Sequence, residues 1–337
     1  VKAIRDANAR HKLARRHRCE YTRALLFSVF FFPNPLECLH PMKVKIEGII
    51  SAMVTPFTKG GQYVDLDKVG AIADRLVKEG AHGLFPCGTT GEGLLQSPEE
   101  RKEVIKEVVE AVGKKATIIA HTGTLDLATT IELTAHAAAN GAHAAAIVAP
   151  GFYGYDDTSL ALYYRAIAKA VSGFPILLYN IPSCARNGLS AELILELANI
   201  DNIVGIKDSS GSMSLLTRLL GNCPKDFAVV NGADEYGYQA FLAGANGVVS
   251  GTSNVVLKLY RTIYDNVKAG KLDKAWAAQV KLEQACRIFE YGKKIAVFKE
   301  GMRLRGFDPG FVRPPQRELD AKERKALEKA LSDAGLI

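Results

Sequence analysis

The sequence predicts an α/β protein built as a closed (β/α)8 barrel, a TIM barrel, with a C-terminal helical extension. Eight short apolar segments recur between about residues 46 and 250, and segments with helical spacing separate them. Beyond about residue 270 only helical patterns follow. Eight strands alternating with helices match the number that such a barrel requires. An open doubly wound sheet also has continuous apolar strands, and the count of eight favours the barrel over it.

The strand candidates are continuous apolar runs, as expected for parallel strands buried on both faces. Three segments, EGAHGLFP, NGAHAAAIV and AGANGVVSG, form a faint internal repeat in which a glycine ends a helix before the next strand begins. The eight candidates begin near residues 46, 83, 117, 144, 176, 203, 228 and 247 and read IEGIISAMV, GLFPCG, TIIAHTG, AAAIVAP, ILLYN, IVGIK, AVVNGAD and GVVSGTS.

The intervening helices have their own markers. The segment SPEE (97–100) puts serine at an N-cap, proline at the first helical position and glutamate three residues after the cap, which is a capping box. After the last strand candidate, KLDKAWAAQVKLEQACRIF and AKERKALEKALSDAG predict two added helices. Steps of three and four, typical of an amphipathic helix, separate Leu66, Val69, Ile72, Ala73, Leu76 and Val77.

The net charge of +7 is unevenly distributed along the 337 residues. Residues 1–41 carry eight Lys/Arg and three Asp/Glu, whereas the remaining 296 residues carry 35 against 33, a balance of +2. A nearly neutral body gives no reason to expect nucleic acid as a partner. No apolar run approaches the roughly 20 residues that span a bilayer, so no membrane partner is expected.

The chain divides into three predicted parts: 1–41 outside the folded domain, 42–270 as the barrel, and 271–337 as a helical region. The first part combines the basic RDANARHKLARRHR with the apolar ALLFSVFFFP, which resembles a signal-peptide core but lacks a clear small-residue cleavage site. We interpret it as a leader or upstream sequence, with a targeting segment as the alternative. The six cysteines form no CxxC pair, which favours reduced thiols and a cytoplasmic location.

Lys207 is the first candidate for chemistry, because it directly follows the apolar run Ile203–Ile206. A lysine desolvated without a partner there would cost several kcal/mol. In a barrel, however, the carboxyl ends of the strands form the active site. Partial desolvation at that mouth lowers the pKa of an amine and frees its lone pair, so we predict a Schiff base with a carbonyl substrate. The alternative is a solvated strand end.

Two further segments accompany this lysine. Tyr179 ends the preceding strand in LLYNIP, where its phenol can move protons beside the amine. PCGTTGEG (86–93) is a glycine-rich turn that carries the hydroxyls of Thr89 and Thr90. Such a turn presents backbone N–H groups to a carboxylate, although a plain tight turn is the alternative, and the glycine spacing is neither that of a P-loop nor GxGxxG.

GTTGEG, YNIP and GIKDSSG, with the lysine 28 residues after the tyrosine, together resemble the dihydrodipicolinate synthase/N-acetylneuraminate lyase family of class I aldolases. The resemblance runs from about Gly48 to the C-terminal helices. It implies a TIM barrel with a C-terminal helical region, a homotetramer, and no metal or organic cofactor. It also implies that the substrates are pyruvate, held as a covalent imine on Lys207, and an aldehyde.

The resemblance further implies roles for individual residues. Tyr179 moves protons during carbon–carbon bond making or breaking, and Thr89 and Thr90 bind the carboxylate and take part in proton relay. Tyr153, in PGFYGY, completes the relay, in some members from a neighbouring subunit. An imine is a better electron sink than a ketone, so the catalytic groups need only deliver and remove protons.

The second substrate is less defined. Synthases of the family carry an arginine five residues after the tyrosine, where this chain has Cys184, and Arg186 is a candidate replacement. Sialic acid lyases carry a glycine and an acidic pair after the seventh strand, where NGADE offers Gly232, Asp234 and Glu235. Carboxylates accept hydrogen bonds from hydroxyls, which suits a polyhydroxylated 2-keto acid. The alternative for Asp234 is a helix cap.

We therefore predict a lyase acting on pyruvate and 2-keto-3-deoxy sugar-type acids, as in N-acetylneuraminate lyase or 2-keto-3-deoxygluconate aldolase. A synthase condensing pyruvate with aspartate semialdehyde, and a non-catalytic keto-acid-binding barrel, are the alternatives. Three histidines, His121, His136 and His143, are not expected to converge on zinc, and Cys87 and Cys184 are interpreted as wall residues of the mouth. The remaining candidate substrate-binding residues are Gly88, Ser209 and Ser250.

Overall fold

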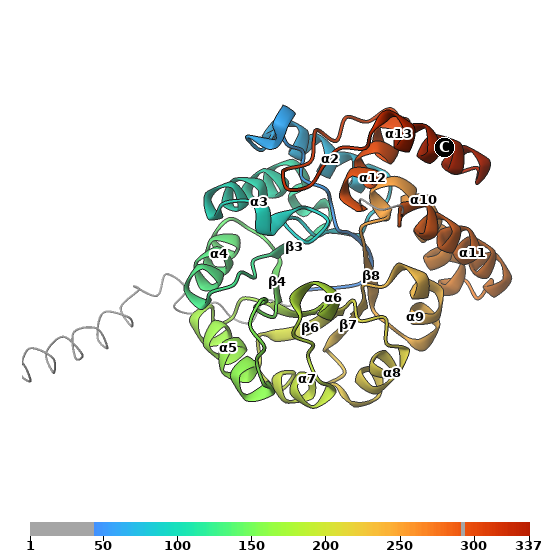
Figure 1. Ribbon diagram of the computed structural model, residues 1–337. Helices are drawn as coiled ribbons and strands as arrows, with labels where there is room; N and C mark the ends of the chain where they lie inside the picture. Colours follow the sequence, from blue (N-terminus) through green and yellow to red (C-terminus); the bar gives the residue numbers. More distant parts are fainter. Residues whose placement is uncertain (1–43, 291–293) are drawn as a thin grey trace, which may run out of the picture. The chain divides into compact units, whose positions relative to one another are not determined.

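The computed structural model describes residues 44–290 and 294–337, and Figure 1 shows a ring of helices around a closed barrel of parallel strands. This confirms the predicted fold class. The predicted leader, residues 1–41, lies outside the described residues. The strands, paired in chain order with β8 closing on β1, are β1 Gly48–Ser51, β2 Gly83–Leu84, β3 Thr117–His121, β4 Ala144–Val148, β5 Ile176–Asn180, β6 Ile203–Asp208, β7 Ala228–Asn231 and β8 Gly247–Ser250.

Strands β2 to β8 begin at the residues that the apolar pattern predicts, and β1 begins at Gly48 rather than near residue 46. The capping box is confirmed, since the Ser97 side chain accepts from the Glu100 amide and the Glu100 side chain accepts from the Ser97 amide. The repeated helix-ending glycines are also confirmed. Gly80, Gly141 and Gly244 have φ values of 105°, 87° and 101°, the left-handed region that glycine adopts without strain.

The helices cover the outside of the barrel because their apolar faces pack against the outward-facing strand residues. Four 3-10 turns, η1 Lys59–Gly61, η2 Gly93–Leu95, η3 Gly113–Lys115 and η4 Asp234–Tyr236, interrupt the connections. The helices that alternate with the strands, ending with the one that follows β8, are α2 Leu66–Lys78, α3 Pro98–Val112, α4 Leu127–Ala139, α5 Asp157–Ala170, α6 Pro182–Ala185, α7 Ala191–Leu197, α8 Met213–Asn222, α9 Gly237–Ala243 and α10 Ser253–Lys268.

Three helices follow the barrel: α11 Leu272–Phe289, α12 Lys294–Leu304 and α13 Ala321–Asp333. The two helices that the sequence predicts here, α11 and α13, are confirmed, and α12 is additional. Figure 1 shows α10 to α13 gathered on one side of the ring. Helix α12 packs against α11 and α13 and also against α10, the helix that follows β8. It is therefore part of the same packed unit as the barrel.

The barrel interior is a separate apolar cluster from the layer between strands and helices. Because side chains alternate along a strand, Leu177 and Tyr179 of β5 point into the barrel while Ile176 and Leu178 point to the helices. Tyr179 is the last interior residue of its strand before Asn180. Within the described ranges, no helix is long and apolar enough to cross a membrane.

Candidate active site

A pocket of about 620 Å³ lies at the carboxyl ends of the strands. Its lining comes from the GTTGEG turn after β2, from the ends of β5, β6, β7 and β8, and from the C-terminal helices α11 and α12. The barrel predicts chemistry at this end of the strands. Of the predicted site residues, the lining includes Thr89, Thr90, Tyr179, Lys207, Ser209, Gly232, Asp234 and Glu235.

Lys207 is buried in the pocket wall, with 5% of its surface exposed. Its Nζ lies 4.0 Å from the Tyr179 ring centroid and 4.4 Å from that of Phe85, so aromatic rings rather than charged groups surround the amine. Among residues 44–290 and 294–337, no carboxylate or hydrogen-bond acceptor is paired with this amine. The amine is therefore available to attack a carbonyl group in the pocket.

The carboxylate next to Lys207 in the chain is already engaged. Asp208 accepts hydrogen bonds from Asn180 Nδ2 at 2.8 Å and from the Ser210 hydroxyl at 2.9 Å. Alternation along β6 directs Asp208 away from the interior face on which Lys207 lies. The strand thus supplies an unpaired amine even though an acid is its immediate neighbour.

Tyr179 lies beside the amine because the register of β5 and β6 pairs it directly with Lys207. Its hydroxyl is 3.2 Å from Thr89 Oγ1, so a hydrogen bond links the phenol to the GTTGEG turn. Edge-to-face contacts with Phe85 and His121, at centroid separations of 5.7 and 5.6 Å, hold the ring in place. Lysine, phenol and threonine hydroxyl therefore follow one another along the pocket wall.

The turn that carries Thr89 and Thr90 depends on glycine. The Gly93 amide donates to Gly88 O at 3.1 Å to close the turn, and a Cβ on Gly93 would overlap the carbonyl oxygen of Cys87. A Cβ on Gly251 would lie 2.7 Å from Thr90 Oγ1, so the backbone after β8 sets the position of that hydroxyl. These close approaches leave no room for another side chain.

His121, at the end of β3, is buried beneath the Tyr179 ring. Its Nδ1 donates to Cys87 O at 2.9 Å, because a carbonyl oxygen only accepts. Burial, reinforced by the neighbouring Arg101 cation, holds the pKa of His121 well below its usual range. The ring is therefore neutral, and the Arg101 guanidinium donates instead to the His121 and Gly123 carbonyls at 2.6 and 3.1 Å.

The pocket lining also includes three carboxylates. Asp234 and Glu235 come from η4, and Glu290 comes from the end of α11. Burial raises the pKa of the Asp234 carboxyl above its ordinary value, and hydrogen bonds from the Thr252 and Tyr260 hydroxyls oppose this rise. Asp234 caps neither η4 nor α9, since neither has a side-chain cap hydrogen bond. The alternative interpretation of Asp234 as a helix cap is therefore wrong.

Four predicted site residues lie outside the pocket lining. Tyr153 is 65% exposed in the loop between β4 and α5, and the Arg186 guanidinium donates to Phe152 O at 3.3 Å rather than reaching the pocket. Ser250 is fully buried and bonded to the Tyr260 hydroxyl at 2.8 Å, because its side chain points to α10. Gly88 contributes only the carbonyl that closes its turn.

The two cysteines interpreted as wall residues differ. Cys184 lines the pocket, whereas Cys87 lies beneath the GTTGEG turn with its thiol directed to Gln96 and the Arg101 carbonyl. Burial raises the pKa of the Cys87 thiol to about 11, so it is protonated at neutral pH. In the described part of the chain, no group of three His, Cys, Asp or Glu residues is arranged to hold a metal ion.

The C-terminal helices contribute lining residues that the sequence did not reveal. Cys286 and Phe289 of α11, Glu290 directly after it, and Phe298 of α12 line the pocket. Local sequence patterns identify these helices as amphipathic but do not say which residues meet the barrel mouth. That depends on how α11 and α12 pack against the barrel.

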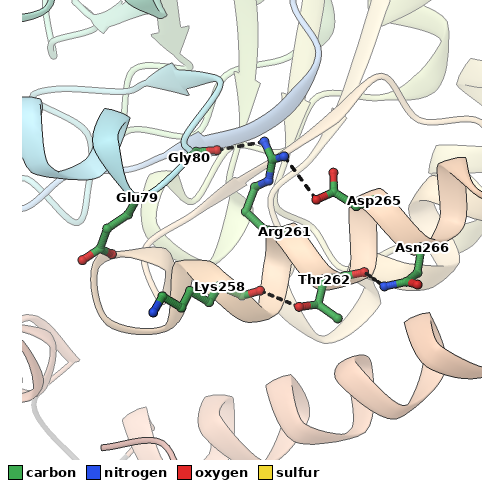
Figure 2. Close-up of a pocket in the computed structure, with 7 residues that line it drawn as sticks. All are labelled: Glu79, Gly80, Lys258, Arg261, Thr262, Asp265 and Asn266. Atoms are coloured by element: carbon green, nitrogen blue, oxygen red, sulfur yellow. Dashed lines mark hydrogen bonds and ion pairs between the residues drawn. The ribbon is translucent and has the colours of Figure 1, made fainter.

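A second, shallower depression lies between the end of α2 and the last turns of α10 (Figure 2). Its main charged group, Arg261, is already paired with Asp265 at 3.1 Å and with Gly80 O at 3.3 Å. Arg261 also contacts His82, which precedes β2, so this depression is at the amino ends of the strands. It is remote from Lys207, and the lysine in its lining, Lys258, is exposed.

The fold and the pocket define a barrel with a buried, unpaired lysine at the carboxyl ends of its strands, and comparison with known proteins gives the class of enzyme. The model of the dihydrodipicolinate synthetase family matches residues 45–334. The chain is 32% identical over 292 residues to N-acetylneuraminate lyase of Rhizobium meliloti, covering 86% of this chain and 95% of that protein. It is 34% identical over 289 residues to 4-hydroxy-tetrahydrodipicolinate synthase of Moorella thermoacetica, covering 86% and 98%.

Among solved structures, the chain is similar to YagE of E. coli K12, a prophage protein of the dihydrodipicolinic acid synthase family determined in complex with pyruvate. The TM-score is 0.83 at 28% identity, with 87% of this chain and 100% of that chain covered. The chain belongs to the dihydrodipicolinate synthetase family, and it is a lyase of the class I aldolase type. The resemblance and the enzyme class predicted from the sequence are confirmed.

Proposed function

We propose that this enzyme forms a Schiff base between Lys207 and pyruvate and reversibly cleaves 2-keto-3-deoxy sugar-type acids. The observation that carries the proposal is that one pocket combines an unpaired amine with carboxylates. The buried Lys207 amine lies beside Tyr179, which is bonded to Thr89. The same lining includes Glu235 and Glu290. The amine suits a keto acid, and carboxylates accept hydrogen bonds from the hydroxyl groups of a sugar-type substrate.

In the proposed reaction, Lys207 Nζ attacks the keto carbon, water leaves, and an imine forms. Thr89 and Thr90, with the backbone N–H groups of their turn, bind the substrate carboxylate. The bond between C3 and C4 then breaks, and its electron pair passes into the imine as an enamine. Tyr179 accepts the proton of the C4 hydroxyl, so an aldehyde leaves, and protonation of C3 with hydrolysis of the imine releases pyruvate.

The charges of the pocket lining favour a neutral aldehyde. The pocket's charged lining beyond Lys207 is made of carboxylates in the described residues, which repel a second substrate carboxylate. The guanidinium of Arg186 is committed to Phe152 O, and Cys184 stands where synthases carry arginine. Condensation of pyruvate with aspartate semialdehyde is therefore the second candidate, and a relative named 4-hydroxy-tetrahydrodipicolinate synthase is the reason to keep it.

The test is borohydride trapping followed by an aldehyde screen. Incubation with pyruvate and reduction are expected to add one pyruvyl group to the peptide that contains Lys207, read by mass spectrometry. N-acetylmannosamine, glyceraldehyde and aspartate semialdehyde are then compared by kcat/KM in the condensation direction. Preference for a neutral aldehyde supports the proposal, and preference for aspartate semialdehyde replaces it with the synthase activity. A folded protein without adduct would favour a non-catalytic keto-acid-binding barrel.

We also propose a homotetramer, as the family resemblance implies. Phe152 and Tyr153 are 74% and 65% exposed in one chain, and large exposed aromatic side chains are typical of subunit interfaces. In that assembly Tyr153 would act from a neighbouring subunit. Sedimentation of the purified protein measures the state, and a monomer with full activity would exclude this role for Tyr153.

Replacing Gly232 by alanine is expected to slow adduct formation on Lys207 by about 100-fold, because small displacements of reacting groups cost rates of this order. A Cβ at this position would overlap Ser209 Oγ and lie 3.1 Å from Lys207 Cε. The rate of trapping at fixed pyruvate measures the effect. Gly221→Ala is the matched control, since nothing lies within 4 Å of its added Cβ. Equal trapping rates in the two variants would contradict the prediction.

A further inference from the structure

Two charged side chains from distant parts of the chain meet at the GTTGEG turn. Lys299 Nζ of α12 lies 2.8 Å from Glu92 Oε1 of the GTTGEG turn, and the two side chains are 0% and 1% exposed. Desolvating both charges is unfavourable unless the remaining hydrogen-bonding capacity is also satisfied. A buried ion pair therefore needs hydrogen-bond partners for every remaining donor of the ammonium group and for the second carboxylate oxygen.

That set is present. The other two donors of the Lys299 ammonium reach Thr55 O at 2.7 Å and Phe311 O at 2.6 Å. The second oxygen of Glu92 accepts from the Arg313 amide at 2.9 Å. Lys299 is thus unlike Lys207: both lysines are buried, but only Lys299 is fully paired. Its ammonium group therefore links α12 to three other segments: the loop after β1, the GTTGEG turn and the segment that contains Phe311.

Glu92 has a backbone conformation that it would not adopt by itself. Its φ is 54° and its ψ is 31°, the left-handed region that disfavours residues with a Cβ by about 1 kcal/mol or more. The Glu92 amide donates to Thr89 O at 3.1 Å, so this strained residue is bonded to one of the threonines in the pocket. Contacts outside the turn must hold the conformation, and the Glu92 carboxylate makes them.

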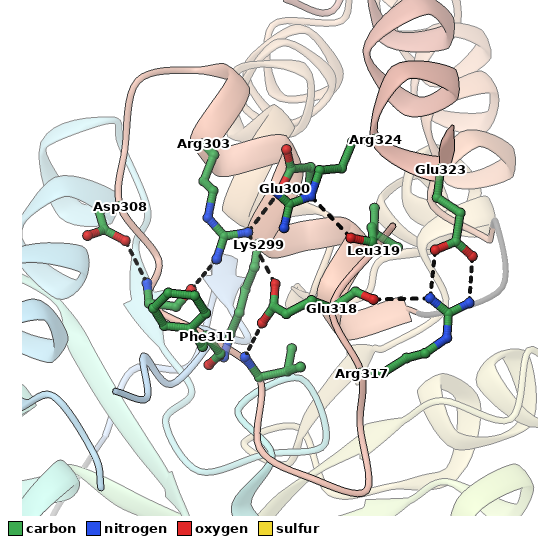
Figure 3. A network of polar contacts seen from close by, with 12 residues as sticks. Lys299, Glu300, Arg303, Asp308, Phe311, Arg317, Glu318, Leu319, Glu323 and Arg324 are labelled. Carbon is green, nitrogen blue, oxygen red and sulfur yellow. Dashed lines mark hydrogen bonds and ion pairs between the residues drawn. The ribbon is translucent and has the colours of Figure 1, made fainter. Parts of the chain in front are cut away.

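Charged side chains also fix the C-terminal segment that contacts Lys299 and Glu92 (Figure 3). Glu318 accepts from the Val312 amide at 2.7 Å, and Arg303 is bonded to Glu300 at 2.9 Å. Arg313 forms two bonds to Glu100, at 2.6 and 2.7 Å, at the start of α3. The carbonyl and amide that meet Lys299 and Glu92 therefore belong to a fixed segment.

We propose that the Glu92–Lys299 ion pair positions the turn that binds the substrate carboxylate, which makes the C-terminal helical region part of the active site. Glu92 and Lys299 are absent from the pocket lining, so they act through Thr89 and Thr90 as positioning residues. The proposal rests on the proposed role of these threonines in pyruvate binding. Releasing the pair lets the turn leave its strained conformation, while Lys207 stays in place on β6.

The test compares Glu92→Gln, Lys299→Met and the double variant, which are close in shape to the native side chains. The double variant is expected to raise KM for pyruvate about tenfold, to change kcat less than about threefold, and to form the Lys207 adduct at saturating pyruvate. Each single variant leaves one buried charge unpaired and is expected to unfold at a lower temperature than the double variant. A double variant with native KM overturns the proposal.

Arg75→Met is the matched control. It breaks another ion pair of low exposure, Arg75–Glu79 at 2.9 Å at the end of α2, whose side chains are 8% and 15% exposed, and is expected to lower the unfolding temperature without changing KM. Amide hydrogen exchange at residues 88–93, measured without pyruvate, tests the positioning role of the ion pair independently of the proposed Schiff-base function. If the native enzyme forms no adduct, the proposed function fails. Faster exchange of this turn in the double variant still supports the positioning role, and unchanged exchange overturns it.

Discussion

Replacing Lys207 by arginine is expected to abolish the borohydride-trapped pyruvyl adduct and to lower kcat by about 10⁴-fold or more, as loss of a catalytic nucleophile does. Arginine keeps a positive charge over the Tyr179 and Phe85 rings, so it tests the nucleophile rather than the charge. A guanidinium stays protonated in proteins and cannot form the imine. Peptide mass spectrometry after reduction, with kcat for pyruvate release, measures both effects.

The two buried lysines make this experiment specific. Lys299 is also buried, but its ammonium donates to Glu92 and to two carbonyl oxygens. It has no free lone pair, so it is not expected to take over the adduct. Pyruvyl label on Lys299, or on any other lysine at the native rate in the Lys207→Arg variant, would contradict the assignment of the nucleophile.

Replacing Tyr179 by phenylalanine has the second largest expected effect, a fall in kcat of about 10²–10⁴-fold, the range that a positioned proton-transfer group contributes. The substitution removes the hydroxyl that lies 3.2 Å from Thr89 Oγ1. It keeps the ring 4.0 Å below the Lys207 amine, so the lysine remains in place and should still be trapped, more slowly, by pyruvate and borohydride. Steady-state kinetics and trapping on the same preparation measure the two quantities.

Tyr164→Phe is the control for this prediction. The Tyr164 hydroxyl is also buried and donates to Ile147 O at 3.1 Å, but it lies on α5 outside the pocket. Its loss is expected to cost about 1 kcal/mol of stability and to leave kcat unchanged. If the two variants had the same kcat, Tyr179 would have only a structural role and the proposed proton transfer would belong to another group.

Much of the fold follows from local patterns. The apolar runs placed the starts of β2 to β8 correctly, and the capping box at Ser97 and the helix-ending glycines were read from neighbouring residues. These features depend on hydrogen bonds and backbone preferences within a few residues of one another. The adjacency of Tyr179 and Lys207 also follows, because consecutive parallel strands of a barrel bring their carboxyl ends together.

The sequence by itself thus determined the barrel, its enzyme family and the strand-end residues of the pocket. Only the tertiary structure decided that Arg186 turns to Phe152 O, that Ser250 faces α10, and that Glu290 lines the pocket. The partnership of Glu92 with Lys299 spans 207 residues of chain. No local pattern encodes it, because such contacts arise from the packing of whole helices against the barrel mouth and from the cost of leaving a buried charge unpaired.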